Sequence, residues 1–218
     1  DFVKTKWKVD ENRICVSGES MGGSGSTFNP IRYPKLFAYA YSAVGIHDPM
    51  LAGYGFHESY QRVNGREKLG IKHASGMDAW DYLSDPKMVL GDPKQALPFI
   101  GYGNGKNAGG IGWPHVVALA KALQQARQPH AVIWNMRGHG AGSFRTGLDH
   151  QLNQSLPAFT HCSLDSDIGT AKRLETPKEV QVKDGSRTVT IKDGYDGDPQ
   201  GQINAFLRWK TDNIVDEA

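Results

Sequence analysis

The sequence has little cysteine, no large excess of charge of one sign and no long hydrophobic run. Its 25 Lys and Arg residues against 23 Asp and Glu residues give a formal net charge of +2. The basic residues are scattered along the chain, which is typical of a solvated surface and argues against a nucleic-acid partner. No run approaches the roughly 18 apolar residues of a membrane-spanning helix. We therefore expect neither a nucleic acid nor a membrane as a partner.

The two cysteines give no sign of a disulfide framework. Cys15 lies in a short apolar run, and Cys162 lies in a polar C-terminal segment. A central strand and a peripheral tail seldom come within the distance that a disulfide requires. We expect the two thiols not to be bonded to each other, with Cys15 buried.

The composition is that of a soluble globular protein, with 39% hydrophobic and 22% charged residues. A chain of 218 residues suits one domain, or one domain with a small appendage. The character of the sequence changes near residue 140, after which it is polar. We therefore divide the chain into a main part, 1–140, and a tail, 141–218.

The segment 18–22 reads G-E-S-M-G and matches the nucleophile-elbow pattern G-x-S-x-G. An apolar, β-branched run at 13–17 predicts a buried strand before it, and the small residues from 22 to about 32 can open a helix. Gly18 and Gly22 lack a Cβ atom, so the two arms can approach closely. This pattern predicts a sharp turn that exposes the Ser20 hydroxyl. The alternative is a flexible Gly/Ser linker.

Three more apolar runs predict strands at 38–45, 97–103 and 130–135. Strands alternating with helices indicate an α/β fold with a mostly parallel sheet and helices on both faces. We expect the connecting helices to include one within 76–90 that ends before Asp85, and one from Trp113 to about Arg127.

The remaining segments are less regular. Residues 1–10 fit the end of an amphipathic helix, and 46–76 predict a Gly-broken excursion with one short helix that shapes a substrate pocket. In the tail, 180–191 predict a β-hairpin, and 203–209 are apolar enough to dock as a strand or short helix. The acidic segment 193–201 is interpreted as turns in preference to a Ca²⁺ site, since it lacks a complete ligand pattern.

A serine hydroxyl needs a base to take its proton, and His139 follows the last predicted parallel strand between two glycines. We predict that this histidine is the general base. The other seven are interpreted as structural or exposed, with a substrate contact as the alternative for His47, His57 and His73 and a place at the pocket rim for His115.

The segments 10–23, 32–38, 105–109 and 138–140 resemble α/β-hydrolase esterases and prolyl-oligopeptidase-type hydrolases. The resemblance implies that 1–140 form the C-terminal part of an α/β-hydrolase catalytic domain, with the polar 141–218 tail and its hairpin packed on or beside it. It also implies a secreted serine esterase that forms an acyl-enzyme and needs no cofactor or metal. The substrate would be a small-molecule or carbohydrate-linked ester.

The same resemblance assigns the remaining roles. The backbone N–H of Met21 would help bind the oxyanion, and Glu19 and Trp113 would contact the substrate. Aromatic residues of the excursion, of the helix after it and of the acid loop offer an apolar surface for an aromatic acyl group or a sugar; they are Tyr54, Phe56, Tyr60, Trp80 and Trp113.

Strands that normally precede the elbow strand have no counterpart in the roughly 12 residues before it. We therefore expect a fragment of a larger enzyme, whose 13–17 strand has one unpaired edge. Association through that edge, or with an N-terminal segment, follows as an expectation.

The position of the triad acid departs from the family pattern, because Ala108 stands where an aspartate is expected. Asp48 is the candidate substitute for the triad acid, because a carboxylate in the loop after the 38–45 strand could also reach His139. Two alternatives to an active esterase stay open: a catalytically weakened or inactive hydrolase-fold binding module, and a prolyl-oligopeptidase-like peptidase.

Overall fold

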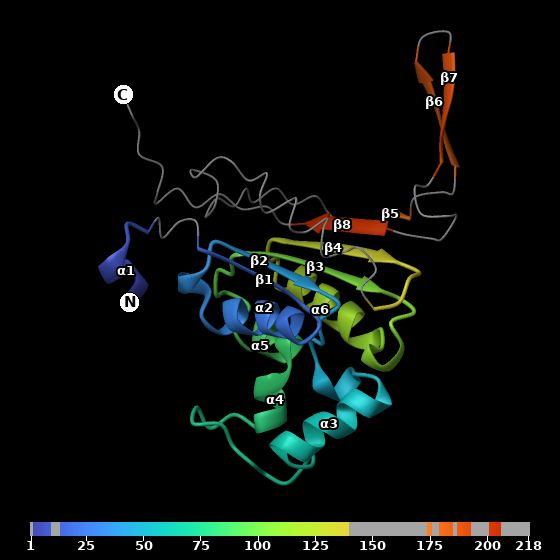
Figure 1. Cartoon of the computed structure of the whole chain (residues 1–218). Coiled ribbons are helices and arrows are strands. Elements are labelled where there is room, and N and C mark those ends of the chain that lie inside the picture. Colours follow the sequence, from blue (N-terminus) through green and yellow to red (C-terminus); the bar gives the residue numbers. More distant parts are fainter. Residues whose placement is uncertain are drawn as a thin grey trace.

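The computed structural model describes residues 2–9 and 14–139 and four later strands, and its centre is a mostly parallel sheet (Figure 1). The sheet order is β1-β2-β3-β4-β8-β5, in which β1 to β4 are parallel and β8 runs antiparallel to both β4 and β5. The sheet strands are β1 (Cys15–Glu19), β2 (Tyr39–Ala43), β3 (Phe99–Gly105), β4 (His130–Asn135), β5 (Leu174–Glu175) and β8 (Gly201–Ala205). A separate hairpin consists of β6 (Glu179–Asp184) and β7 (Arg187–Lys192).

The helices lie mainly between the parallel strands in the chain. They are α1 (Phe2–Lys6), α2 (Met21–Arg32), α3 (Tyr54–Asn64), α4 (Ala79–Leu83), α5 (Asp85–Gly91) and α6 (Pro114–Gln125), with single-turn helices η2 (Pro34–Leu36), η3 (Pro49–Leu51) and η4 (Gly109–Ile111). No helix in the described part of the chain is both long and apolar enough to cross a membrane.

The four predicted parallel strands are present, and their burial explains their composition. All five residues of β2 are buried, because the strand pairs with β1 and β3 at its edges and packs against an apolar cluster on each face. Strands buried on both faces read as continuous apolar runs, without alternation. That is why the run at 38–45 identified β2 from the sequence.

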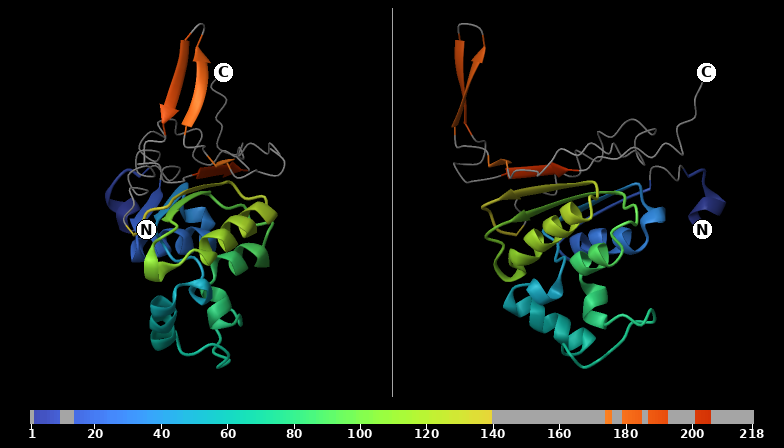
Figure 2. Two further views of the ribbon diagram at one scale, coloured as in Figure 1. Left: turned by 90° about the vertical axis from the view of Figure 1, so that its right-hand side faces the viewer. Right: turned by 180° about the vertical axis from the view of Figure 1, so that it is seen from behind.

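Helices α2, α5 and α6 all lie on the same face of the sheet (Figures 1 and 2). The main core forms beneath them, with Ile100 and Tyr102 of β3 against Leu119 and Leu123 of α6. The expectation of helices on both faces therefore differs from what the described residues show. Parallel strands that follow one another in sequence order, each joined by a right-handed crossover, place every connecting helix on one side.

The opposite face of β2 carries a second apolar cluster. Tyr39 and Tyr41 are buried there with Val44 and Ile46, and the Tyr39 ring stacks on Phe99 with 5.7 Å between ring centroids. These tyrosines alternate along β2 with residues that face the helices, so one strand contributes to two cores.

Strand β1 lies at the edge of the sheet, as the sequence predicts. Within the described residues it pairs with β2 alone. The hairpin β6–β7 also forms as predicted, but as a two-stranded sheet of its own, so it does not pair with β1.

Two helix predictions need correction. The single helix expected within 76–90 is two helices, α4 and α5, and Asp85 begins the second instead of following the end of the first. The Ser84 hydroxyl accepts a hydrogen bond from Lys87 N as the cap of α5, and Pro86 occupies an early position where its missing N–H is harmless. Helix α1 is present, but it buries no residue, and Phe2 is 70% exposed.

Some predictions concern residues that the structure does not describe. Cys162 and the 193–200 segment lie outside the described residues, as does most of the 203–209 segment beyond β8. Cys15 is described; it lies at the start of β1 and is half-buried, not fully buried as we expected.

Candidate active site

Ser20 lies between the end of β1 and the start of α2, at the predicted strand-to-helix turn. Its backbone has φ 56° and ψ −117°, which L-residues rarely adopt and which costs about 1–3 kcal/mol. Two backbone hydrogen bonds hold this conformation: Ser20 N donates to Ala43 O at 2.9 Å, and Ser24 N donates to Ser20 O at 3.0 Å. The turn is therefore fixed by the neighbouring strand as well as by its own helix.

The glycines around Ser20 permit this turn, although not as the sequence pattern suggested. A Cβ atom on Gly18 would lie 2.5 Å from the carbonyl carbon of Gly22, so Gly18 has the expected role. A Cβ atom on Gly22 would meet nothing within 4 Å. The second glycine that the turn requires is Gly23, where a Cβ atom would collide with Ala43 O. That contact lets α2 lie against β2, and no pattern within 18–23 identifies it.

The His139 ring lies beside Ser20, in the segment that follows the carboxyl end of β4. Its Nε2 atom lies 2.9 Å from Ser20 Oγ, a hydrogen-bond distance, although the two residues are 119 positions apart in the sequence. A serine donating to an imidazole nitrogen is the arrangement in which a base can activate a nucleophile.

The segment before His139 is held by the loop after β3. Lys106 N donates to Asn135 O at 2.8 Å, and Asn107 N donates to Arg137 O at 3.1 Å. Gly105 allows this approach, because a Cβ atom there would lie closer than any allowed contact to Arg137 O. The 105–108 loop therefore lies beside the segment that carries the histidine.

The structure places Ala108 on this loop but does not bring Asp48 to His139. Ala108 is buried in the second apolar cluster, with its N–H donating to Gly105 O. Asp48 is buried too, and its carboxylate accepts hydrogen bonds from Met50 N at 2.9 Å and from Ser84 Oγ at 2.7 Å. Among the described residues no carboxylate contacts the His139 ring.

Met21 occupies the first position of α2, and its side chain is 88% exposed. The opening N–H groups of a helix have no partner within that helix, and the helix dipole favours negative charge beside them. The Met21 N–H therefore suits an oxyanion next to Ser20.

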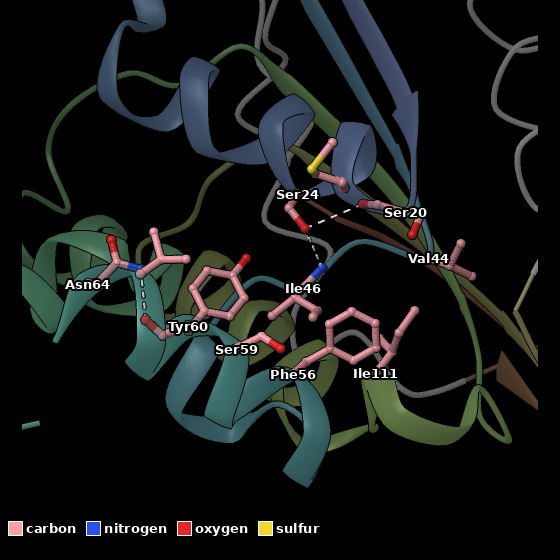
Figure 3. A pocket seen from close by; sticks show the side chains of 11 residues that line it. Ser20, Ser24, Val44, Ile46, Phe56, Ser59, Tyr60, Asn64 and Ile111 are labelled. Carbon is pink, nitrogen blue, oxygen red and sulfur yellow. Dashed lines mark hydrogen bonds between the residues drawn. The ribbon is translucent and has the colours of Figure 1, made fainter. Parts of the chain in front are cut away.

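A cavity of about 330 Å³ opens beside Ser20 (Figure 3). Its apolar lining residues are Met21, Val44, Ile46, Phe56, Val63 and Ile111. Its polar lining residues are Ser20, Ser24, Ser59, Tyr60 and Asn64. None of the described residues that line it is charged, so the cavity suits a neutral, apolar group.

Several predicted substrate contacts lie elsewhere. Glu19 is exposed at the end of β1, and Trp113 packs against the main core; neither lines the cavity. Of the aromatic residues predicted to form a substrate surface, Phe56 and Tyr60 line the cavity. Tyr54 is exposed outside it, and Trp80 is buried with its indole N–H donating to Gly65 O at 3.2 Å.

The cavity floor was not predicted from the sequence. Val44 follows β2 with φ 45°, a rare conformation for a β-branched residue, and its N–H donates to Gly103 O. Ile46 N donates to Ser24 Oγ at 2.8 Å, and this hydrogen bond connects the cavity floor to helix α2. Ile111 comes from η4, and only the folded chain brings these residues together.

The histidines named as alternatives for substrate contact have partners inside the protein. His57 Nε2 lies 2.6 Å from Glu67 Oε1, and the His73 ring stacks on Tyr82. His47 is fully buried, with Nδ1 at 3.0 Å from Thr27 Oγ1 and 3.8 Å from Asp85 Oδ2.

Burial determines the pKa values of this buried polar cluster. It lowers the pKa of His47 well below the usual range, reinforced by nearby His115, and lowers the pKa of His115 to about 4. Burial also raises the pKa of Asp85 to about 6, although Arg32 lies 2.7 Å from the carboxylate and opposes the shift. Among the described residues, no group of three or more His, Cys, Asp or Glu could hold a metal ion.

No family model matches the sequence, and no curated protein matches it. Solved structures with a similar fold include a protein described as a dipeptidyl aminopeptidase IV from Bacteroides ovatus, with TM-score 0.55 and 19% identity over 70% of this chain and 20% of that one. A puromycin-hydrolyzing peptidase from Mycobacterium tuberculosis has TM-score 0.55 and 18% identity over 73% of this chain and 23% of that one.

An S-formylglutathione hydrolase from Agrobacterium tumefaciens has TM-score 0.51 and 16% identity over 69% of this chain and 51% of that one. This chain therefore spans between a fifth and about half of the length of these proteins. At such low identity the similarity shows the fold alone, and that fold is the α/β-hydrolase fold.

Proposed function

We propose that this chain belongs to a serine hydrolase that cleaves carboxylic esters through an acyl-enzyme. The observation that supports the proposal is the 2.9 Å contact between His139 Nε2 and Ser20 Oγ, made at a strained strand-to-helix turn. Strained backbone persists only where the surrounding structure holds it, and it is concentrated at functional sites.

The chemistry divides between these residues in two steps. His139 takes the Ser20 proton as Oγ forms a bond to the ester carbonyl carbon, and the Met21 N–H donates to the resulting oxyanion. The bond to the alcohol oxygen then breaks, and His139 gives its proton to the departing alcohol. Water attacks the acyl-enzyme with His139 again as base, which releases the carboxylic acid and restores Ser20.

An ester is favoured over a peptide as the substrate. Both reactions pass through an imidazolium on His139, and among the described residues no carboxylate stabilises that charge. An alcohol leaves from the tetrahedral intermediate more readily than an amine does, so ester cleavage depends less on a carboxylate partner for His139. The alcohol half of the substrate, small or carbohydrate-linked, is proposed from the family resemblance alone.

The test is hydrolysis of p-nitrophenyl acetate by the full chain and by two variants, Ser20→Ala and Ser75→Ala. Ser75 is an exposed serine whose hydroxyl contacts His73 away from the cavity, so it serves as the matched control. We expect activity to disappear with Ser20→Ala and to survive with Ser75→Ala. A stoichiometric fluorophosphonate adduct, located by peptide mass spectrometry, should map to Ser20.

A rate that is the same in the chain and in Ser20→Ala overturns the assignment of the nucleophile. A folded chain that neither hydrolyses the ester nor reacts with the fluorophosphonate supports the inactive binding module instead.

A further inference from the structure

The cavity beside Ser20 contacts only one half of an ester bound there. Ser20 and Met21 line it, whereas His139 does not. Since His139 must hand a proton to the departing alcohol, the alcohol lies on the His139 side of Ser20. The group that remains attached to Ser20 Oγ is the acyl group, and the cavity is therefore the place for it.

The walls of the cavity are two aromatic rings and an aliphatic floor. Phe56 and Tyr60 are one turn apart on α3, and Figure 3 shows their rings beside Ile46 and Ile111. Phe56 is 41% exposed, so part of its ring is free to be covered by a ligand. Ring faces of this kind pack best against another ring, in offset or edge-to-face geometry.

The position of α3 is fixed against the rest of the site. Gly53 N, at the start of this helix, donates to Ile111 O at 3.0 Å. A Cβ atom on Gly53 would collide with Gly110 O, so the two backbones are in direct contact. The ring of Phe56 also lies against Gly110. The distance between the aromatic wall and the floor is therefore set by backbone packing.

Size and charge limit what fits. A dry cavity of about 150 Å³ is enough to bind benzene, so about 330 Å³ takes one ring with a short linker. The polar groups at the α3 side are neutral: Ser59 Oγ donates to Gly55 O, and Asn64 Nδ2 donates to Tyr60 O. In the part of the chain that the structure describes, no lining residue carries a charge that could neutralise a carboxylate or an ammonium group.

We propose that this cavity selects an uncharged acyl group built on a single aromatic ring, and that Phe56 and Tyr60 determine this specificity. The proposal rests on the ester hydrolase function proposed above. It extends that function from the class of bond to the class of acid released, an aryl carboxylic acid.

The experiment uses trifluoroethyl esters, whose activated leaving group contains no ring that could enter the cavity itself. The full chain is given the acetate, benzoate, hexanoate and monosuccinate esters, and acid release is followed in a pH-stat. We expect kcat/KM to be highest for benzoate and lowest for the charged succinate. A hexanoate value equal to or above that of benzoate overturns the aromatic specificity, and a succinate value equal to that of benzoate overturns the neutral cavity.

Two substitutions locate the specificity. Phe56→Leu keeps an apolar side chain but removes the ring, and we expect it to lower the benzoate-to-hexanoate ratio about tenfold, the upper range for one aromatic pair. Tyr54→Leu, on the same helix but 79% exposed and outside the cavity, is the matched control and should leave the ratio unchanged. An unchanged ratio in Phe56→Leu refutes the role of the aromatic wall.

Failure of the proposed function leaves this inference testable. If the chain hydrolyses no ester, binding of trifluoroethyl benzoate to the full chain is measured by ligand-observed NMR. Binding that weakens in Phe56→Leu and not in Tyr54→Leu supports the aryl site without turnover. Absence of binding refutes it.

Discussion

Ala108→Asp should raise esterase activity, because it returns a carboxylate to the loop beside His139. A carboxylate that accepts the imidazole N–H fixes the tautomer of the base and stabilises the imidazolium. Replacing the triad Asp by Asn in a serine protease lowers kcat by about 10⁴, which sets the largest gain to be expected here.

The structure reduces that gain at neutral pH. Ala108 is only 3% exposed and packs with Tyr39, Tyr41 and Ile111. Burial among apolar groups disfavours the charged form, so the pKa of the new carboxyl would rise. Each unit by which that pKa exceeds the assay pH lowers the charged fraction about tenfold, so we expect a gain of about 10²–10³ at pH 7 that grows toward pH 9.

The assay is p-nitrophenyl acetate hydrolysis from pH 6 to pH 9, with folding checked by circular dichroism. Asn107→Asp is the matched variant, because Asn107 is the exposed neighbour on the same loop and its side chain donates to Met136 O. We expect little gain from Asn107→Asp, and little loss from Asp48→Asn, whose oxygens are bound to Met50 and Ser84.

A folded Ala108→Asp variant with no gain at any pH refutes the assignment of the acid position. A gain in Asn107→Asp alone moves the acid position by one residue. Loss of activity in Asp48→Asn shows that the relay runs through the loop after β2.

Three further predictions concern stability. Gly23→Ala should destabilise the fold by about 2–3 kcal/mol in urea unfolding, because its Cβ atom would collide with Ala43 O. The control is Gly25→Ala in the same helix, whose Cβ atom meets only Asn29 at 3.8 Å and which should stabilise the fold by about 0.5–1 kcal/mol. Equal effects of the two substitutions would refute the close packing at Gly23. Arg32→Gln breaks a buried ion pair with Asp85 and should lower the free energy of unfolding by about 3–5 kcal/mol. Lys87→Gln, in the exposed pair with Asp81, should lower it by less than about 1 kcal/mol. Urea unfolding of both variants tests this, and equal losses would contradict it. Acidification from pH 6.5 to 4 should destabilise the protein, because the pKa values of His47, His115 and His130 are lowered in the folded state and the unfolded chain takes up those protons first. The raised pKa of Asp85 opposes this loss over the same pH range, so Asp85→Asn should make it steeper. A free energy of unfolding that rises on acidification would refute the dominance of the histidines.

The sequence predicts well those features of this molecule that a short segment identifies by itself. Residues 18–22 are enough to recognise the elbow turn, and a continuous apolar run is enough to recognise strand β2, so both can be predicted without knowing the fold. The split between α4 and α5 was missed because Asp85-Pro86 is typical both of a turn that ends a helix and of the first turn of a new one. Capping by Ser84 determines which of these occurs.

What the sequence could not give is contact between segments far apart in the chain. Position 23 must be glycine because its backbone lies against Ala43 O, twenty positions away, and the Asp48 carboxylate accepts a hydrogen bond from Ser84. Neither contact is visible in a local sequence pattern. The cavity is a stronger case, since its floor and its wall come from separate elements, with Ile46 after β2 and Phe56 on α3.

The site nevertheless follows from one global feature that the sequence did predict, the parallel order of the strands. Parallel strands bring their carboxyl ends to the same edge of a sheet, and ligands of open α/β sheets bind there. Ser20 follows β1, Val44 follows β2, Ala108 follows β3 and His139 follows β4, in the order in which the strands lie side by side. The four loops are coupled by backbone hydrogen bonds, from Ser20 N to Ala43 O, from Val44 N to Gly103 O, and from Asn107 N to Arg137 O. Because backbone hydrogen bonds anchor each loop to its neighbour, the 2.9 Å contact between His139 and Ser20 depends on how all four loops are placed at this edge of the sheet.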